Sequence, residues 1–275
     1  MIRSLIVFLM LSLSGALACV VQGHAASSDW IETEGARLRL VADGQPRDGV
    51  LHAMIDIELK DGWKTYWREP GANGIPPSID ITASHSIADA EILFPAPERI
   101  DEGYGAFIGY DAPVRLPVRF ELHPSDKVER IRASVFLGIC ERICVPVQTE
   151  FDLELTSTAS QALDAALVAQ SFAALPASPS RAFFVDGARW NEEGDRLLVT
   201  VRHPDTAGFA EPTLFAAPPT GWHFGGVKAV ESLPDGTVFA IKVKQRPEAR
   251  SDKPENAAVV VRTVSHAMQD TITLP

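Results

Sequence analysis

Short segments in which apolar and polar residues alternate recur along most of the chain, and this pattern constrains the fold more than any other feature. Residues 51–59 read LHAMIDIEL, with an apolar side chain at every odd position. The same alternation recurs at residues 36–43, 114–122, 130–139 and 149–155, with Gly, Pro or Asp between the segments. Successive side chains of a strand point to opposite faces, so each segment predicts a strand. Many short strands separated by turn residues predict an all-β sandwich.

A different pattern follows this region. Residues 160–175 are rich in Ala and Leu, and their apolar side chains mostly follow helical spacing. Pro176 and Pro179 then end the predicted helix. Alternating segments return at residues 196–203, 236–244 and 257–264. We therefore expect a mainly β protein with a sandwich at 28–156, a helix and Pro/Ser linker at 157–180, and a second β domain at 181–275.

The first 26 residues are predicted to be a secretory signal peptide. Arg3 supplies a positive charge, residues 5–13 supply an apolar segment, and small residues at Ala25 and Ala26 supply a cleavage site. The apolar run is short for a membrane anchor. Cys19 is a poorer match to a lipoprotein processing site, because Ala16 stands where a larger aliphatic residue is usual. We therefore expect export from the cytoplasm.

The charge balance disfavours two classes of partner. The chain has 25 Lys and Arg against 36 Asp and Glu, a net charge of −11, and no run rich in Lys or Arg. Binding to nucleic acid or to an anionic membrane surface depends on such basic patches. Neither a phosphate-binding glycine loop nor a catalytic GxSxG or HExxH motif is present. We expect no nucleic-acid partner and no cofactor.

Residues 138–147, GICERICVPV, contain Cys140 and Cys144. Strand patterns enter at Cys140 and leave at Cys144, with three residues between them, which suits the tip of a β-hairpin. Paired positions across a hairpin place Cα atoms about 4.5 to 5.5 Å apart, within disulfide range. In an oxidising compartment we expect the two thiols to be bonded. We expect Pro146 to interrupt strand pairing close to this tip.

From the residues alone, redox exchange, a local structural disulfide and metal binding all stay open for this pair. The closed loop is so short that the chain-entropy model gives only about 2 kcal/mol of stabilisation. A disulfide at a hairpin tip is accessible to an attacking thiolate. Arg142 would favour a thiolate, whereas Glu141 would oppose it. The histidines form no spaced cluster for a zinc site, although two thiolates can hold Cu(I).

Three segments carry a resemblance to a known family. They are DGWKTYWREPGANGIPPSI at 61–79, DEGYGAFIGYDAPVRLPV at 101–118 and CERICVPV at 140–147. Together they resemble the periplasmic N-terminal domain of the thiol:disulfide interchange protein DsbD, especially its ScsB-like (suppressor of copper sensitivity) branch. The resemblance is clear over residues 30–155 and continues more weakly through the second β domain.

The resemblance implies an immunoglobulin-like sandwich with the cysteine pair on a hairpin, so we expect two such sandwiches. It implies a periplasmic thiol:disulfide oxidoreductase. Electrons would come from a membrane-embedded DsbD- or CcdA-like transporter and pass to periplasmic thioredoxin-like proteins. No later segment is long enough to span a membrane, so we expect the electron donor to be a separate protein. Copper tolerance or cytochrome c biogenesis is the implied setting.

The resemblance also assigns roles to individual residues. Cys140 and Cys144 correspond to the redox pair, with Cys144 facing the partners. Asp101, Glu102, Tyr104 and Gly105 correspond to a loop that caps the pair, Tyr66 to an aromatic residue beside it, and Trp63 to the equivalent aromatic-rich turn. The acidic residues of the cap would influence the thiol pKa.

The chain departs from the DsbD pattern in two places. The three-residue spacing between the cysteines is shorter than in DsbD and fits the ScsB-like branch. Gly103 stands where the DsbD cap has a Phe that packs over the disulfide. Either cover for the disulfide comes from Tyr104, Phe107 or elsewhere, or the site is more open than in DsbD.

Two other functions stay open at this point. One is a secreted binding module in which the Cys140–Cys144 disulfide is inert. The other is a Cu(I)-binding protein that uses the reduced pair. The sequence assigns no role to the second β domain.

Overall fold

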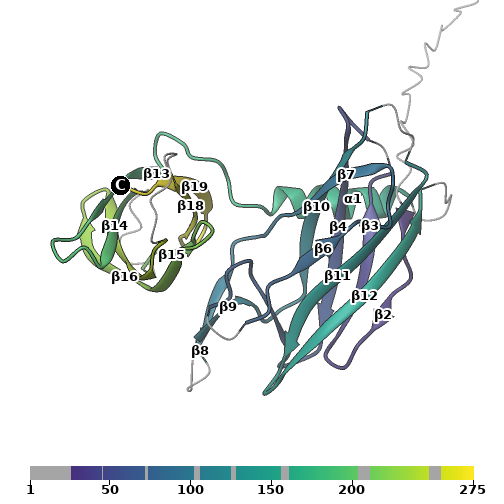
Figure 1. Ribbon diagram of the computed structural model, residues 1–275, viewed down its shortest axis with the longest axis horizontal. Coiled ribbons are helices and arrows are strands. Elements are labelled where there is room, and N and C mark those ends of the chain that lie inside the picture. Colours follow the sequence, from purple (N-terminus) through teal and green to yellow (C-terminus); the bar gives the residue numbers. More distant parts are fainter. Residues whose placement is uncertain are drawn as a thin grey trace, which may run out of the picture.

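The protein is mainly β, with its strands arranged as two sandwiches that lie side by side (Figure 1). This confirms the fold class expected from the alternating segments. The computed structural model describes residues 26–44, 46–71, 74–101, 106–124, 128–155, 161–203, 211–247 and 255–275. Most of the predicted signal peptide lies outside the described residues. Ala26 is already part of the fold, because it pairs with Ala42 and is buried.

The first sandwich consists of two antiparallel sheets. One sheet has the order β1 (Ala26–Ser27), β3 (Ala36–Ala42), β4 (Val50–Leu59), β10 (Val114–Leu122) and β7 (Ile87–Ile92), with β2 (Ile31–Glu32) paired to β3. The other has the order β12 (Cys144–Glu154), β11 (Arg130–Cys140), β5 (Lys64–Tyr66), β9 (Ala106–Tyr110) and β8 (Glu98–Asp101), with β6 (Ser78–Asp80) paired to β11.

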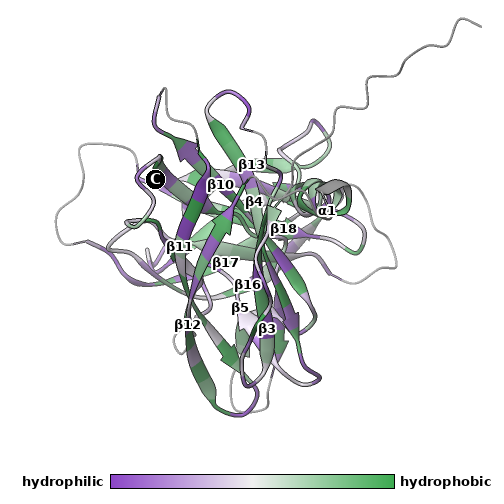
Figure 2. Cartoon of the chain, turned by 90° about the vertical axis from the view of Figure 1, so that its right-hand side faces the viewer, coloured by the Kyte–Doolittle hydropathy of each residue, from purple (hydrophilic) through white to green (hydrophobic). Residues whose placement is uncertain are grey.

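Alternation along the strands builds the core between these sheets. In β4 the side chains of Leu51, Ala53, Ile55 and Ile57 are fully buried, as the sequence pattern predicts. Buried residues likewise alternate with more exposed ones from Arg130 to Leu137 of β11 and along β12, whose hydropathy Figure 2 shows. Burial of this apolar surface is the main stabilising contribution to the sandwich.

The outer face of β4 is also buried, which the alternation does not predict. Helix α1 (Gln161–Ala173) lies across it, and Val168 packs against Val41 and Met54. The Asp56 carboxylate, also on this face, lies 2.9 Å from an Arg39 guanidinium nitrogen. The helix therefore converts a solvated sheet face into a second buried layer.

The second sandwich is smaller. One sheet has the order β13 (Phe184–Trp190), β14 (Arg196–Arg202), β17 (Gly236–Gln245) and β16 (His223–Leu233). The other has the order β15 (Thr213–Ala217), β18 (Asn256–Arg262) and β19 (Ala267–Thr273). Its core has its own set of buried aliphatic and aromatic side chains.

The connection between the sandwiches is short. Helix α1 ends at Ala173, and Ala177 already forms an isolated parallel bridge with Met268 of the second sandwich. The Ala177 amide donates to the Ala267 carbonyl over 2.9 Å. Side-chain contact adds to this, because Phe215 of β15 packs edge-on against the buried Trp67, with ring centroids 6.1 Å apart.

The burial pattern predicts different costs for two phenylalanines of the first sandwich. Phe120 is 0% exposed, whereas Phe136 is 38% exposed. Phe120→Ala should lower the free energy of unfolding by about 3–5 kcal/mol, because it leaves a core cavity. Phe136→Ala should change it by about 0.5 kcal/mol or less. Urea unfolding followed by fluorescence measures both, and equal losses would contradict the assigned burial.

Candidate functional site

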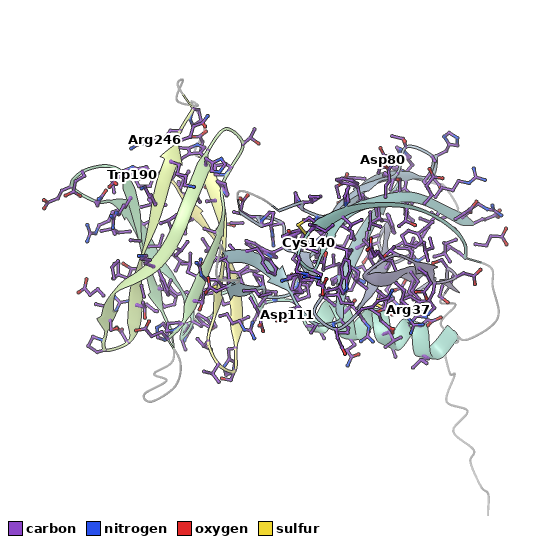
Figure 3. All side chains as sticks on the ribbon, turned by 90° about the horizontal axis from the view of Figure 1, so that it is seen from below. Arg37, Asp80, Asp111, Cys140, Trp190 and Arg246 are labelled. Carbon is purple, nitrogen blue, oxygen red and sulfur yellow. A yellow bond between two sulfur atoms is a disulfide. The ribbon has the colours of Figure 1, made fainter. Side chains whose placement is uncertain are left out.

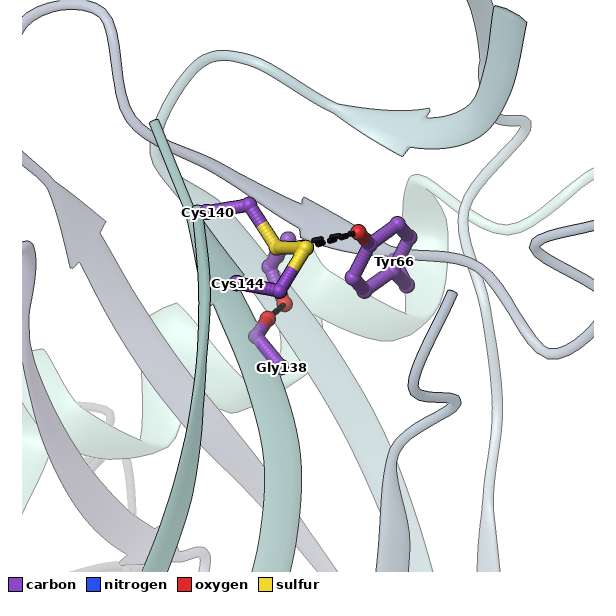
Figure 4. The surroundings of a disulfide bond; sticks show 5 residues. Tyr66, Gly138, Cys140 and Cys144 are labelled. Atoms are coloured by element: carbon purple, nitrogen blue, oxygen red, sulfur yellow. Dashed lines mark hydrogen bonds between the residues drawn. A yellow bond between two sulfur atoms is a disulfide. The ribbon is translucent and has the colours of Figure 1, made fainter. Parts of the chain in front are cut away.

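The cysteine pair lies at the tip of the hairpin formed by β11 and β12. The register is continuous from Arg130 opposite Glu154 to Cys140 opposite Cys144. The two cysteines form a disulfide, with Cα atoms 4.2 Å apart (Figure 4). The turn between them consists of residues 141–143, as the sequence predicts.

Pro146 does not interrupt the ladder, so that expectation was wrong. It stands opposite Gly138 within the continuous register. The physical reason is that β12 is the terminal strand of its sheet. A proline is tolerated in such a strand, where its nitrogen can face away from the neighbour.

The two sulfur-bearing residues differ in exposure. Cys140 is 4% exposed, whereas Cys144 is exposed. The difference follows from the topology, because Cys140 lies between Cys144 on one side and Lys64 of β5 on the other. In the part of the chain that the structure describes, Cys144 has a neighbouring strand on one side only. An incoming thiolate therefore reaches the Cys144 sulfur more easily than the Cys140 sulfur.

The Tyr66 hydroxyl contacts both sulfurs. Its oxygen lies 2.9 Å from Cys140 Sγ and 2.8 Å from Cys144 Sγ (Figure 4). Disulfide sulfurs carry no hydrogen, so the tyrosine O–H is the donor in both contacts. Tyr66 is itself buried. When the disulfide opens, the same O–H can donate to the sulfur that leaves as a thiolate, and bonds to charged acceptors are the stronger ones.

The position of Tyr66 depends on a glycine in β11. A Cβ atom at Gly138 would lie 2.8 Å from Tyr66 Cε2 and 2.9 Å from Ile75 Cβ, so the ring packs directly on the backbone there. The Thr65 hydroxyl, on the opposite face of β5, donates to the Gly138 carbonyl over 2.9 Å. These two contacts join β5 to the cysteine hairpin.

An apolar cluster surrounds the buried sulfur. Tyr66, Phe107 and Cys140 form it, with Ile75 and Ile100 packed against them. The Tyr66 and Phe107 rings meet edge to face, with centroids 5.6 Å apart. Phe107, one of the residues considered for covering the disulfide, thus belongs to its surroundings. Exclusion of water here strengthens the tyrosine–sulfur contacts.

Lys64 is a neighbour that the sequence reasoning missed. Its position pairs directly with Cys140, and its ammonium lies 5.2 Å from the Phe107 ring centroid. The available signal was alternation, since residues 64 and 66 of a strand share a face. Arg142 and Glu141, which were expected to have opposite effects on the thiols, are paired with each other at 3.9 Å.

The remaining predicted site residues are placed as follows. Asp101, at the end of β8, is exposed, and its carboxylate lies 3.4 Å from a guanidinium nitrogen of Arg99. The Trp63 ring packs against Gly35 and the core of the first sandwich, not in the cluster around Cys140. Glu102, Tyr104 and Gly105 lie outside the described residues.

The described residues lack two kinds of feature, a cluster of metal ligands and a membrane-spanning helix. They contain no group of three or more His, Cys, Asp or Glu side chains arranged to hold a metal ion. Among the same residues, no helix has the length and apolar character needed to cross a membrane.

Comparisons with known proteins relate the first sandwich to one family and the fold of the chain to one solved structure. Residues 33–156 match the family described as "Thiol:disulfide interchange protein DsbD, N-terminal". The crystal structure of the N-terminal periplasmic domain of ScsB from Proteus mirabilis superposes with a TM-score of 0.73 at 21% identity, covering 91% of this chain and 99% of that one. The human Desmocollin-1 ectodomain aligns at 7% identity with a TM-score of 0.22, covering 91% and 51%. Curated proteins gave no sequence match.

The Tyr66 contacts predict a specific kinetic effect. Tyr66→Phe should slow reduction of the disulfide by dithiothreitol about ten- to hundredfold. The reason is that a hydrogen bond to a charged group contributes about 1.5–3 kcal/mol, and 1.36 kcal/mol is a factor of ten in rate. Stopped-flow kinetics at fixed pH measure the rate.

Tyr110→Phe is the matched control. Its hydroxyl donates to the Pro95 carbonyl over 2.8 Å rather than to sulfur. Its rate should equal that of the wild type. Equal slowing in the two variants would show that the Tyr66 hydroxyl has no special role.

Proposed function

Since residues 33–156 belong to the family of DsbD N-terminal domains, we propose that this chain is a periplasmic thiol:disulfide exchange protein. It receives two electrons from a separate membrane-embedded transporter and passes them to periplasmic thioredoxin-like proteins. The observation that supports this most directly is the asymmetry of the pair. Cys144 is exposed at a hairpin tip and Cys140 is buried, while the Tyr66 hydroxyl contacts both sulfurs.

Electron uptake begins at the exposed sulfur. A thiolate of the donor attacks Cys144 Sγ, a sulfur–sulfur bond forms between the two proteins, and the Cys140–Cys144 bond breaks. Cys140 leaves as a thiolate, and the Tyr66 O–H donates to it. A second donor thiolate then attacks the donor's own sulfur in the mixed disulfide. This releases Cys144 as a thiolate and oxidises the donor.

Electron delivery runs the same steps in reverse. The Cys144 thiolate attacks a disulfide of the acceptor and forms a mixed disulfide, and one acceptor sulfur leaves as a thiolate. Cys140 then attacks Cys144 Sγ. The acceptor leaves as a dithiol, and the Cys140–Cys144 disulfide is restored. Two electrons have moved, and the protons follow from solvent according to the thiol pKa values.

The energetics favour exchange over a structural role. The ring closed by the disulfide is so short that the entropic stabilisation is only about 2 kcal/mol. The hairpin is already held by the β11–β12 ladder and by β5 and β6. Opening the disulfide therefore removes little of what holds the tip together.

The setting in the cell is part of the same proposal. The predicted signal peptide and the membership of residues 33–156 in a DsbD family support a periplasmic location. Copper tolerance or cytochrome c biogenesis is the process we propose for the relay, on the resemblance to the ScsB-like branch. Binding of Cu(I) by the reduced pair is a separate activity, which metal titration of the cysteine variants would detect.

The deciding measurement is the reduction potential of the Cys140–Cys144 pair. Equilibration of the mature protein in defined thiol buffers should give a value above about −300 mV, the range of exchange proteins. A value well below this would identify a structural disulfide and favour the binding-module function.

Single-cysteine variants test the asymmetry of the pair. Cys140→Ala keeps the exposed thiol, and Cys144→Ala keeps the buried one. The first should form a mixed disulfide with Ellman's reagent at least about tenfold faster, since exposure and thiolate character govern reactivity. Both variants should stay folded, losing about 2 kcal/mol of stability relative to the oxidised protein. Equal rates would contradict attack at Cys144.

A further inference from the structure

The β8–β9 hairpin covers the disulfide from the side opposite to β12. Ile100 of β8 stands directly opposite Phe107 of β9. Both side chains contribute to the apolar cluster around Cys140 and Tyr66. One face of this hairpin therefore forms part of the wall of the site.

The hairpin has few attachments within its own sheet. Among the described residues, β8 is the terminal strand of its sheet and pairs only with β9. β9 in turn pairs with β5 at two positions, Thr65 with Tyr110 and Tyr66 with Gly109, and Ile108 adds backbone hydrogen bonds with Trp67 and Pro70. By comparison, β11 and β12 are in register over their full length. The β8–β9 hairpin is thus attached to its sheet over a shorter length than the cysteine hairpin, so contacts from other parts of the molecule add to its anchoring.

The second sandwich supplies those contacts. The Arg262 guanidinium, from the end of β18, lies 2.7 Å from the Glu98 carboxylate at the start of β8. It also donates to the Pro97 carbonyl over 3.3 Å. Nearby, Phe215 packs against the buried Trp67. A charged and an apolar contact thus meet at the base of the hairpin.

The opposite face of the β8–β9 hairpin, which points away from the disulfide, borders a cleft between the sandwiches. Its volume is about 200 Å³, and it is lined by Arg99, Ala106 and Ile108 on one side and by residues of β15 and β16 on the other. Glu69 also lines it, and burial raises the pKa of this carboxyl, an effect that His223 of β16 opposes. The two sandwiches therefore desolvate groups at their shared boundary.

The cysteine pair lies on the side of the first sandwich nearest to the second, as the position of Cys140 shows (Figure 3). We propose that the second sandwich positions the β8–β9 hairpin over the disulfide, with Arg262 as the positioning residue, and so limits the access of attacking nucleophiles to the sulfurs. This deepens, and for its biological meaning rests on, the exchange function proposed above. It gives the second sandwich a role at a site to which it contributes no reacting atom.

Charge reversal across the ion pair tests the proposal. The probe is tris(2-carboxyethyl)phosphine, which attacks one sulfur and is converted to its oxide by water while both sulfurs become thiols. Arg262→Glu and Glu98→Arg should each raise the second-order rate of reduction about two- to fivefold, because an exposed ion pair contributes up to about 1 kcal/mol. The double variant, with the charges exchanged, should return to the wild-type rate.

Three further variants separate positioning from general damage. Arg262→Lys keeps the charge and should stay close to the wild-type rate. Glu98→Gln changes no residue of the second sandwich and should also raise the rate, which keeps the test valid where a reversal variant fails to fold. Arg202→Glu breaks an ion pair with Asp186, 2.8 Å long, inside the second sandwich, and should leave the rate unchanged.

Two results would overturn the proposal. One is a wild-type rate of reduction in Glu98→Gln and in both reversal variants. The other is a raised rate in the reversal variants that does not return to the wild-type value in the double variant. The phosphine reduces disulfides irrespective of their potential. A reduction potential of the Cys140–Cys144 pair well below about −300 mV would therefore end the exchange function but leave the comparison of reduction rates valid. Unchanged reduction rates in a protein whose potential is above about −300 mV would end only the positioning role.

Discussion

The in-register pairing of β11 with its neighbours is the interaction on which the site depends. On one side the ladder with β12 brings Cys140 opposite Cys144, and on the other the short pairing with β5 brings Tyr66 to the sulfurs. A slip of one residue would turn every side chain of the strand to the other face. The core alternation that stabilises the sandwich therefore also fixes the face on which both cysteines lie, and the strand order leaves Cys144 the more exposed of the two.

The residues that contact the disulfide also take part in the packing between β5 and β11. Gly138 leaves room for the Tyr66 ring, and its carbonyl accepts from the buried Thr65. The ring in turn covers Cys140. The site is thus rigid on the side of the leaving sulfur and open on the side of the attacked one. This combination suits a disulfide that must open and close repeatedly without the fold changing.

Much of the fold was predictable from the sequence because alternation is a local signal. Segments of a few residues predict the helix, the hairpin position of the cysteines and eight of the strands, namely β3, β4, β10, β11, β12, β14, β17 and β18. Burial of Met54 and Asp56 was not predictable from β4 alone, because it depends on the helix that packs across the strand from over a hundred residues away. Pairing through Pro146 likewise depends on which strand is terminal in the sheet.

The candidate site was predictable to a smaller extent. The cysteines and Tyr66 were found through motifs, and the structure brings them within contact distance. Lys64 was missed because its position beside Cys140 depends on pairing between β5 and β11. Trp63, grouped with the site by its neighbours in sequence, turns to the core instead. The contribution of Arg262 has no local signal, since it comes from the other sandwich.

The short connection between the sandwiches has a consequence for how weak contacts act. With α1 docked on the first sheet and Ala177 bridged to the second sandwich, only residues 174–176 lie between the two anchors. Three residues reach about 10 Å when fully extended. The two bodies therefore stay close after any single contact breaks, and Arg262 meets Glu98 at a high effective concentration. A surface ion pair of ordinary strength can then hold an arrangement that it could not hold between separate proteins.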